Sequence, residues 1–263
     1  MGAEAGTTGD VVAWTMVRDR IMLVTMQRPP ANALGEVLLD GLQQAMDAAE
    51  RRGDVKVMVL SSALDGFFAA GADIKHLARI DGETFTAYGD NMRAVNDRMA
   101  AAPWISIAAV NGMALGGGLE LAMACTLRVA GPKARFGLPE VKIGLIPGAG
   151  GTQRLPRLVG RGRALDIMLT GRQVPAGEAH AIGLVDRLTD GDAVDAALSL
   201  ADELATASLP AQLAVVRTVD KAADVALADG MRYEVEEEQA LFEHGEAAEG
   251  IAAFIEKRTP AFR

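Results

Sequence analysis

The sequence has 263 residues, of which 50% are hydrophobic and 23% charged, so we expect a large folded core rather than disorder. A formal net charge of −9 excludes the broad basic surface that nucleic-acid binding requires. The single cysteine, Cys125, excludes an internal disulfide framework and favours a reducing compartment.

The sequence gives no positive evidence for a targeting signal or for a membrane span. The first ten residues lack an apolar or arginine-rich pattern, so we expect a cytoplasmic protein. Residues 99–119 carry no charge and are long enough to raise the possibility of a membrane span. Pro103 and three successive glycines interrupt this segment, and a buried strand followed by a glycine loop explains it better. We therefore expect no membrane span.

Strands and helices alternate along the first part of the chain. The hydrophobic patterns predict an N-terminal hairpin, then helices and strands in turn, with loops that are rich in glycine. The expected elements are strands at 11–17, 21–26, 55–60 and 105–110, helices at 36–52, 83–101 and 119–124, and loops at 67–73 and after 110. This alternation predicts an α/β fold with right-handed crossovers.

The composition changes beyond about residue 190. Segments rich in alanine and glutamate at 193–207, 210–221 and 229–242 predict helices. We expect residues 1–195 to form a core that holds the active site and residues 196–263 to form a C-terminal helical region. This region should pack against the core or against a neighbouring subunit.

Several common site types are excluded by missing motifs. The sequence has no G-x-S-x-G, Walker A or H-E-x-x-H motif, which argues against hydrolase triads, P-loops and zinc proteases. Gln153 stands where a dinucleotide-binding motif would have its last glycine. His76, His180 and His244 lack ligand spacing, so we expect no metal.

Three clusters remain that can carry chemistry. They are FAAGADIK at 68–75, NGMALGGGLELA at 111–122 and FGLPEVKIGLIPGAGGTQRL at 136–155. Glycine and alanine let the backbone approach a ligand, and N–H groups at loop-to-helix junctions can donate to a developing oxyanion. Two such loops could hold one thioester carbonyl between them.

Two glutamates lie in apolar surroundings within these clusters. Glu120 is in an apolar helical segment and Glu140 follows Pro139, so partial desolvation should raise the pKa of each carboxyl. Taken singly, Glu120 is better explained as a surface or ion-paired residue and Glu140 as a helix cap. Their occurrence together with the glycine clusters favours an acid–base pair.

Together the three clusters resemble the enoyl-CoA hydratase/isomerase (crotonase) superfamily, and the resemblance extends from the N-terminal hairpin to the last helix. It implies a β-β-α spiral core with a C-terminal helical region, assembled as a homotrimer or homohexamer. It also implies two catalytic acids, Glu120 in GGGLE and Glu140 in LPEVKIG, and an oxyanion hole formed by the backbone N–H groups of Ala72 and Gly117.

The same resemblance suggests contacts to the substrate and its coenzyme A. The positions that match are Ala70, Ile74, Lys75, Gly148, Phe254 and Lys257. Lys257 would reach the nucleotide of an adjacent protomer.

The resemblance implies reversible hydration of 2-trans-enoyl-CoA to 3-hydroxyacyl-CoA in fatty-acid or related acyl-CoA degradation. Coenzyme A would be part of the substrate, and no separate cofactor is expected. Two alternatives stay open: a Δ3–Δ2 enoyl-CoA isomerase that uses Glu140 alone, and a non-catalytic acyl-CoA-binding protein.

Overall fold

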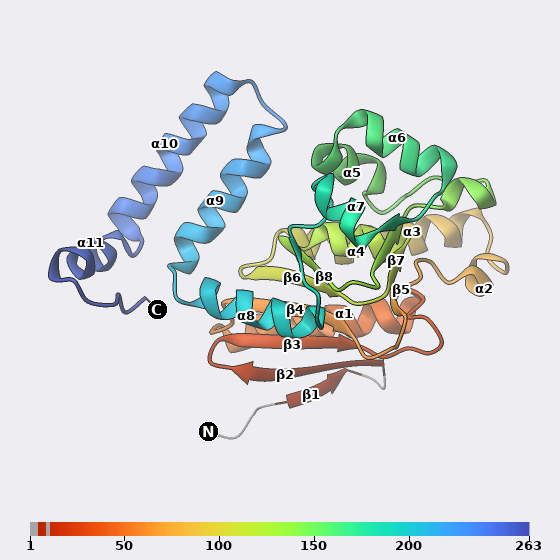
Figure 1. Cartoon of the computed structure of the whole chain (residues 1–263), viewed down its shortest axis with the longest axis horizontal. Helices are drawn as coiled ribbons and strands as arrows, with labels where there is room; N and C mark the ends of the chain where they lie inside the picture. The colour runs from red at the N-terminus through yellow and green to blue at the C-terminus, as the bar shows by residue number, and fades with distance from the viewer. Residues whose placement is uncertain (1–4, 9–10, 263) are drawn as a thin grey trace.

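The computed structural model describes residues 5–8 and 11–262, which form two β-sheets with helices packed against them (Figure 1). The larger sheet has the order β1-β2-β3-β4-β6-β8-β11, and the smaller has the order β10-β9-β7-β5. The strands of the larger sheet are β1 (Ala5–Thr8), β2 (Val12–Arg18), β3 (Ile21–Met26), β4 (Val57–Ser62), β6 (Ile105–Val110), β8 (Leu127–Ala130) and β11 (Arg187–Leu188). Those of the smaller sheet are β5 (Phe67–Ala69), β7 (Met113–Leu115), β9 (Arg135–Gly137) and β10 (Val174–Pro175).

The helices follow the chain order given in Figure 1. They are α1 (Glu36–Arg52), α2 (Ile74–Leu77), α3 (Gly82–Ala100), α4 (Gly117–Ala124), the 3-10 helix η2 (Glu140–Ile143), α5 (Gly151–Val159), α6 (Arg161–Thr170), α7 (Ala176–Ala181), α8 (Ala193–Ala205), α9 (Leu209–Ala222), α10 (Leu227–His244) and α11 (Ala247–Glu256). The predicted α1 agrees with the observed helix, which ends at Gly53 in the left-handed conformation that glycine adopts readily.

The central strands of the larger sheet are buried on both faces. In β4, Val57 and Val59 contact α8, whereas Met58 and Leu60 belong to the main core that α1, α3 and α4 also line. This alternation follows from the period of two in a strand, and both faces are apolar because helices cover both. The uncharged segment that suggested a membrane span contains β6, which is one of these buried strands.

The chain forms a spiral in which successive turns supply both sheets. The consecutive pairs β4 and β5, β6 and β7, and β8 and β9 each place one strand in the larger sheet and the next in the smaller sheet. β3, β4, β6, β8 and β11 pair in parallel, while β1, β2 and β3 form antiparallel pairs. The predicted α/β class and β-β-α spiral core are confirmed, as is the N-terminal hairpin.

The smaller sheet was not predicted. The prediction of loops was wrong in part for two segments, because each contains a short strand. Residues 67–73 begin with β5, and the glycine loop after residue 110 contains β7. Each of these strands has only three residues, which is too short to show a period of two. They are specified by parallel pairing with each other and with β9, which is a tertiary effect.

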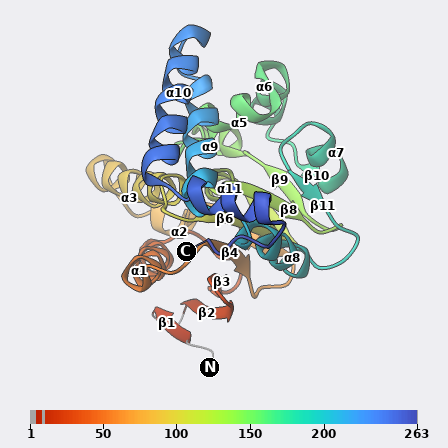
Figure 2. The same ribbon diagram turned by 90° about the vertical axis from the view of Figure 1, so that its left-hand side faces the viewer.

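The C-terminal helices extend beyond the sheets. Helices α9 and α10 run side by side and project away from the rest of the molecule (Figures 1 and 2). Helix α8 crosses the predicted division at residue 195 and lies against the larger sheet through Ala197, Leu200 and Ala201. Both the division at residue 195 and the trimeric or hexameric assembly stay predictions.

Two further observations bear on membrane insertion and on the single cysteine. Within residues 5–8 and 11–262, no helix combines the length and apolar character needed to cross a membrane. Cys125 is buried, and burial raises the pKa of its thiol to about 12.

Candidate active site

A cavity of about 530 Å³ lies where the three sequence clusters meet. Both candidate glutamates line it, and so do the two loops expected to form the oxyanion hole. Apolar side chains from α3 and from the segment after η2 supply much of the remaining wall, including Phe85, Met92 and Ile146. A cavity of this size with a few convergent polar groups is typical of a small-molecule site.

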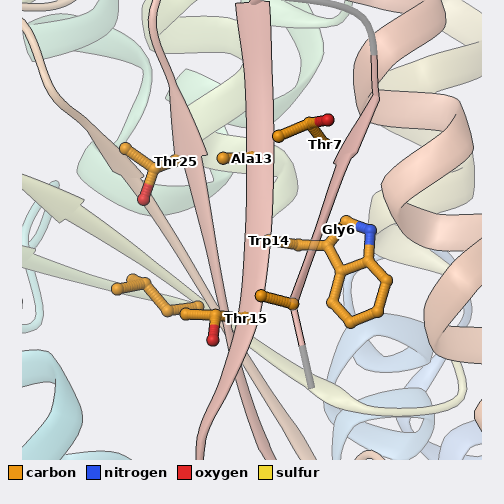
Figure 3. Close-up of a pocket in the computed structure, with 8 residues that line it drawn as sticks. Gly6, Thr7, Ala13, Trp14, Thr15 and Thr25 are labelled. Carbon is orange, nitrogen blue, oxygen red and sulfur yellow. The ribbon is translucent and has the colours of Figure 1, made fainter. Parts of the chain in front are cut away.

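A second hollow, of about 440 Å³, lies on β1, β2 and β3 (Figure 3). It is lined by small and neutral residues such as Thr7, Thr15 and Thr25, and the indole ring of Trp14 lies beside Gly6 (Figure 3). Among the residues that the structure describes, those that line this hollow carry no titratable side chain.

The loop before α2 is fixed in place by backbone and side-chain contacts. Gly71 O accepts a hydrogen bond from Leu34 N at 2.7 Å. The carboxylate of Asp73 accepts from Lys75 N and His76 N and pairs with Arg28 at 2.7 Å. The hydrogen bond from Arg28 is the main reason that the pKa of Asp73 lies below its usual value. Asp73 therefore has a structural role, because it closes the turn and caps α2.

The backbone N–H groups of Ala72 and Gly117 come close together. A Cβ placed on Gly117 would lie 3.7 Å from Ala72 N, and one placed on Gly71 would lie 3.1 Å from Gly117 N. Gly117 is the first residue of α4, so its N–H has no acceptor within the helix. Gly71 has φ +88, and a Cβ placed there would lie 2.7 Å from Leu115 O, so a larger residue would separate the two loops. The two N–H groups therefore lie on adjoining loops that line the cavity, and their role as an oxyanion hole stays a prediction.

Glu120 lies in the first turn of α4 and is 1% exposed. Its Oε1 accepts hydrogen bonds from Ala149 N at 2.8 Å and from Gly151 N at 2.7 Å. Burial raises the pKa of Glu120, while these two N–H groups oppose that rise by stabilising the carboxylate. Glu120 is thus a buried carboxyl whose charged form has dedicated donors.

Glu140 is the first residue of η2 and has a different environment. Its Oε2 is buried and has no hydrogen-bond partner among the described residues. Burial, with a contribution from the nearby charge of Glu120, raises the pKa of Glu140 to about 7. A Cβ placed on Gly116 would lie 2.9 Å from Glu140 Oε1, so glycine at this position leaves room for the carboxyl. Near neutral pH a larger fraction of Glu140 is therefore protonated than of an ordinary glutamate.

The predicted substrate contacts divide into two groups. Ala70, Ile74 and Gly148 line the same cavity as the glutamates. Lys75, Phe254 and Lys257 are exposed and do not line it; Phe254 is 85% exposed. Their coenzyme A contacts stay predictions.

Sequence reasoning missed Tyr88, whose hydroxyl holds the loop before α2. Its hydroxyl accepts from Asp73 N at 3.1 Å and donates to Leu34 O, and its ring is buried. The only local signal was an aromatic residue on the inner face of α3, which normally indicates core packing. The hydroxyl contacts could not be read from the sequence because they join three separate segments.

The described residues contain no cluster of three or more His, Cys, Asp and Glu side chains arranged as a metal site. The polar groups that line the cavity include the two carboxyls, backbone N–H groups and the side chains of Thr86, Tyr88, Arg93 and Lys142. Lys142 Nζ donates to Gly171 O at 2.6 Å.

Comparison with known proteins gives a consistent result. The sequence profile described as enoyl-CoA hydratase/isomerase matches residues 17–263. The chain is 41% identical over 246 residues to a probable enoyl-CoA hydratase from Rhizobium meliloti, an alignment that covers 93% of this chain and 95% of the relative. It is 39% identical over 267 residues to the human enoyl-CoA hydratase domain-containing protein 2, mitochondrial, covering 99% of this chain and 91% of the relative.

Solved structures agree in fold along nearly the whole chain. The crystal structure of an enoyl-CoA hydratase from Bacillus anthracis superposes with a TM-score of 0.90 at 33% identity, covering 95% of this chain and 98% of that chain. The structure of Pseudomonas aeruginosa DspI gives a TM-score of 0.92 at 35% identity, covering 98% of each chain. The chain belongs to the enoyl-CoA hydratase/isomerase (crotonase) superfamily, which confirms the family predicted from its three clusters.

Proposed function

We propose that this protein is an enoyl-CoA hydratase that adds water reversibly across the double bond of a 2-trans-enoyl-CoA to give a 3-hydroxyacyl-CoA. The observation that carries the proposal is the contrast between the two carboxyls that line one cavity. Glu120 has two N–H donors for its charged form, whereas the pKa of Glu140 is raised to about 7. One group is suited to accept a proton and the other to donate one.

The backbone supplies the electrostatic part of this mechanism. The thioester oxygen would accept hydrogen bonds from Ala72 N–H and Gly117 N–H, which stabilise the negative charge that it gains as water attacks C3. These donors are held in place before the reaction by the turn at Asp73 and by the start of α4. The protein therefore does not have to reorganise when the charge develops.

The two carboxyls divide the proton transfers. The Glu120 carboxylate takes a proton from water as the water oxygen bonds to C3, and protonated Glu140 gives its proton to C2. The product gains one H and one OH, and the pair is left with the proton on Glu120. Transfer of that proton to Glu140 restores the starting state, so no redox cofactor or metal enters this account.

The biological setting is part of the proposal. The names of the relatives above support an acyl-CoA substrate, and the reaction would serve fatty-acid or related acyl-CoA degradation. We further infer a cytoplasmic homotrimer or homohexamer, in which Phe254 and Lys257 would contact coenzyme A.

An enoyl-CoA isomerase is the main alternative, because a single carboxyl near pKa 7 can also carry a proton between C4 and C2. The fixed position of Glu120 favours hydration, since a second buried carboxylate with two donors has no role in that isomerisation. A non-catalytic acyl-CoA-binding protein would not need either carboxyl, and burying two unused carboxyls would be costly.

The proposal is tested by following the loss of conjugated-thioester absorbance of crotonyl-CoA. Wild type is compared with Glu120→Gln, with Glu140→Gln and with the control Glu238→Gln, which changes an exposed glutamate on α10. We expect each of the first two variants to lose about 10²- to 10⁴-fold in kcat and the control to match wild type. Absence of hydration by a wild-type protein that binds crotonyl-CoA would contradict the proposal, and a 3-enoyl-CoA turned over equally by Glu120→Gln would favour the isomerase.

A further inference from the structure

One peptide group connects an arginine on α3 to the carboxylate of Glu120. The N–H of Ala149 donates to Glu120 Oε1 at 2.8 Å. The carbonyl of the same peptide unit, Gly148 O, accepts a hydrogen bond from Arg93 Nη1 at 2.9 Å. The guanidinium, the peptide and the carboxylate therefore form a continuous hydrogen-bonded chain.

We propose that Arg93 is a positioning residue that acts on Glu120 through the Gly148–Ala149 peptide group. This inference deepens the proposed hydration, and its kinetic consequence rests on Glu120 being the base of that reaction. Hydrogen bonding by a cation to the carbonyl polarises the peptide and makes its N–H a stronger donor. The same contact fixes the plane of the peptide, so that the N–H stays directed at Oε1.

A second contact from α3 holds the following peptide. Asn96 is buried, and its Nδ2 donates to Ala149 O at 2.9 Å. Two successive carbonyls of the loop are thus attached to one helix, which lies outside the three sequence clusters. Arg93 also pairs with Asp90 at 2.6 Å, an i,i+3 contact within α3 that partly offsets the charge of the guanidinium.

Several charged groups act on Glu120 from the surrounding elements. Burial is the main influence and raises its pKa, whereas the cations Arg154 on α5 and Arg93 on α3 lower it. Arg154 is partly neutralised by Asp97 at 2.9 Å, and Arg93 by Asp90. Glu140 on η2 is the other titratable group close enough for coupling, since the charge of Glu120 raises its pKa.

Loss of Arg93 should therefore raise the pKa of Glu120. Without the cation, the Ala149 N–H is a weaker and less fixed donor, so the charged form of Glu120 is less stable and its pKa rises further. At each pH around its titration midpoint, a larger fraction of Glu120 is then protonated and cannot accept a proton from water. Arg93 also lines the cavity, so a role limited to shaping the cavity is the competing explanation.

The test measures the titration of Glu120 directly, without any substrate. Protein labelled with ¹³C at the glutamate carboxyl carbons is titrated by NMR, and Glu120→Gln identifies the resonance of Glu120. Arg93→Met removes the charge, Arg93→Lys retains it, and Asp90→Asn is the matched control because it removes a neighbouring charge but leaves the Arg93 contact to Gly148. We expect the titration midpoint to rise by about one pH unit in Arg93→Met and to change much less in the other two variants.

Kinetics on crotonyl-CoA provide the second readout. In Arg93→Met the acid limb of kcat/KM should move to higher pH by the same amount as the NMR midpoint. On that acid limb kcat should fall by up to about tenfold, with little change in KM. Arg93→Lys should recover most of kcat.

The inference is overturned if Glu120 titrates identically in wild type and Arg93→Met. If KM alone also changes in that variant, the role of Arg93 is limited to lining the cavity. Failure of the proposed function is a different result, because a wild type that hydrates no enoyl-CoA can still show the shift by NMR.

Discussion

Replacing Glu140 by glutamine should make the protein more stable at alkaline pH while it removes activity. The pKa of Glu140 is raised from 4.5 to about 7, so the native state binds its proton more tightly than the unfolded state does. Between these two values the native state holds more protons, and its free energy of unfolding must therefore fall as pH rises. Glutamine has no such dependence because it stays neutral.

The size of the effect follows from the two pKa values. At pH 4.5 the cost of the raised pKa is only about 0.4 kcal/mol, because the native carboxyl is still protonated and the unfolded one is only half ionised. It reaches about 2 kcal/mol at pH 6 and about 3 kcal/mol at pH 8, where the carboxyl is ionised in both states. Relative to wild type, Glu140→Gln should thus gain about 3 kcal/mol between acid and alkaline conditions.

Denaturant unfolding of wild type and Glu140→Gln at a series of pH values measures this difference. Only its change with pH is diagnostic, because the amide also differs from the carboxyl in its hydrogen bonding. The exposed control Glu238→Gln should show a difference that stays nearly constant across the same range. A constant difference for Glu140→Gln as well would refute the reasoning, since Glu140 would then have the same pKa folded and unfolded.

Three further outcomes are expected. The kcat/KM for hydration should fall above about pH 7, because Glu140 must be protonated; a pH profile with no alkaline limb below about pH 9 would contradict this. Tyr88→Phe should lower the free energy of unfolding by about 1–3 kcal/mol and lower kcat more than it changes KM, because Asp73 N–H loses its acceptor beside the proposed oxyanion hole. Denaturant unfolding and steady-state kinetics measure these effects, and an unchanged kcat would count against this role of Tyr88. Gly116→Ala should lower the free energy of unfolding by about 1–3 kcal/mol and reduce kcat at least about tenfold, because φ is +54 and the new Cβ would lie 2.9 Å from Glu140 Oε1. A fully active variant would show that the Glu140 carboxyl can move aside.

Most elements of the fold could be predicted because each depends on a local pattern. The hairpin and α1 were predicted from strand and helix periodicity, and Gly53 marked the end of α1. Strands β5 and β7 could not be found in this way, because three residues carry no periodicity and their pairing joins segments far apart in the chain.

The candidate site shows the same limit. Glu120, Glu140 and the glycine loops lie within short motifs, and the structure brings them to one cavity. The groups that orient them do not lie in motifs: Arg93 and Gly148 are 55 residues apart. Such contacts depend on how α3 packs against the loop before α5, which no local pattern specifies.

The most direct test of the two-glutamate account uses water labelled with ¹⁸O. Crotonyl-CoA is incubated with wild type or Glu120→Gln, and the product is analysed by mass spectrometry. We expect wild type to form 3-hydroxybutyryl-CoA with one ¹⁸O on C3, and Glu120→Gln to form almost none. Unlabelled or absent product from wild type, or equal labelling by Glu120→Gln, would contradict the claim that Glu120 activates water for addition to the double bond.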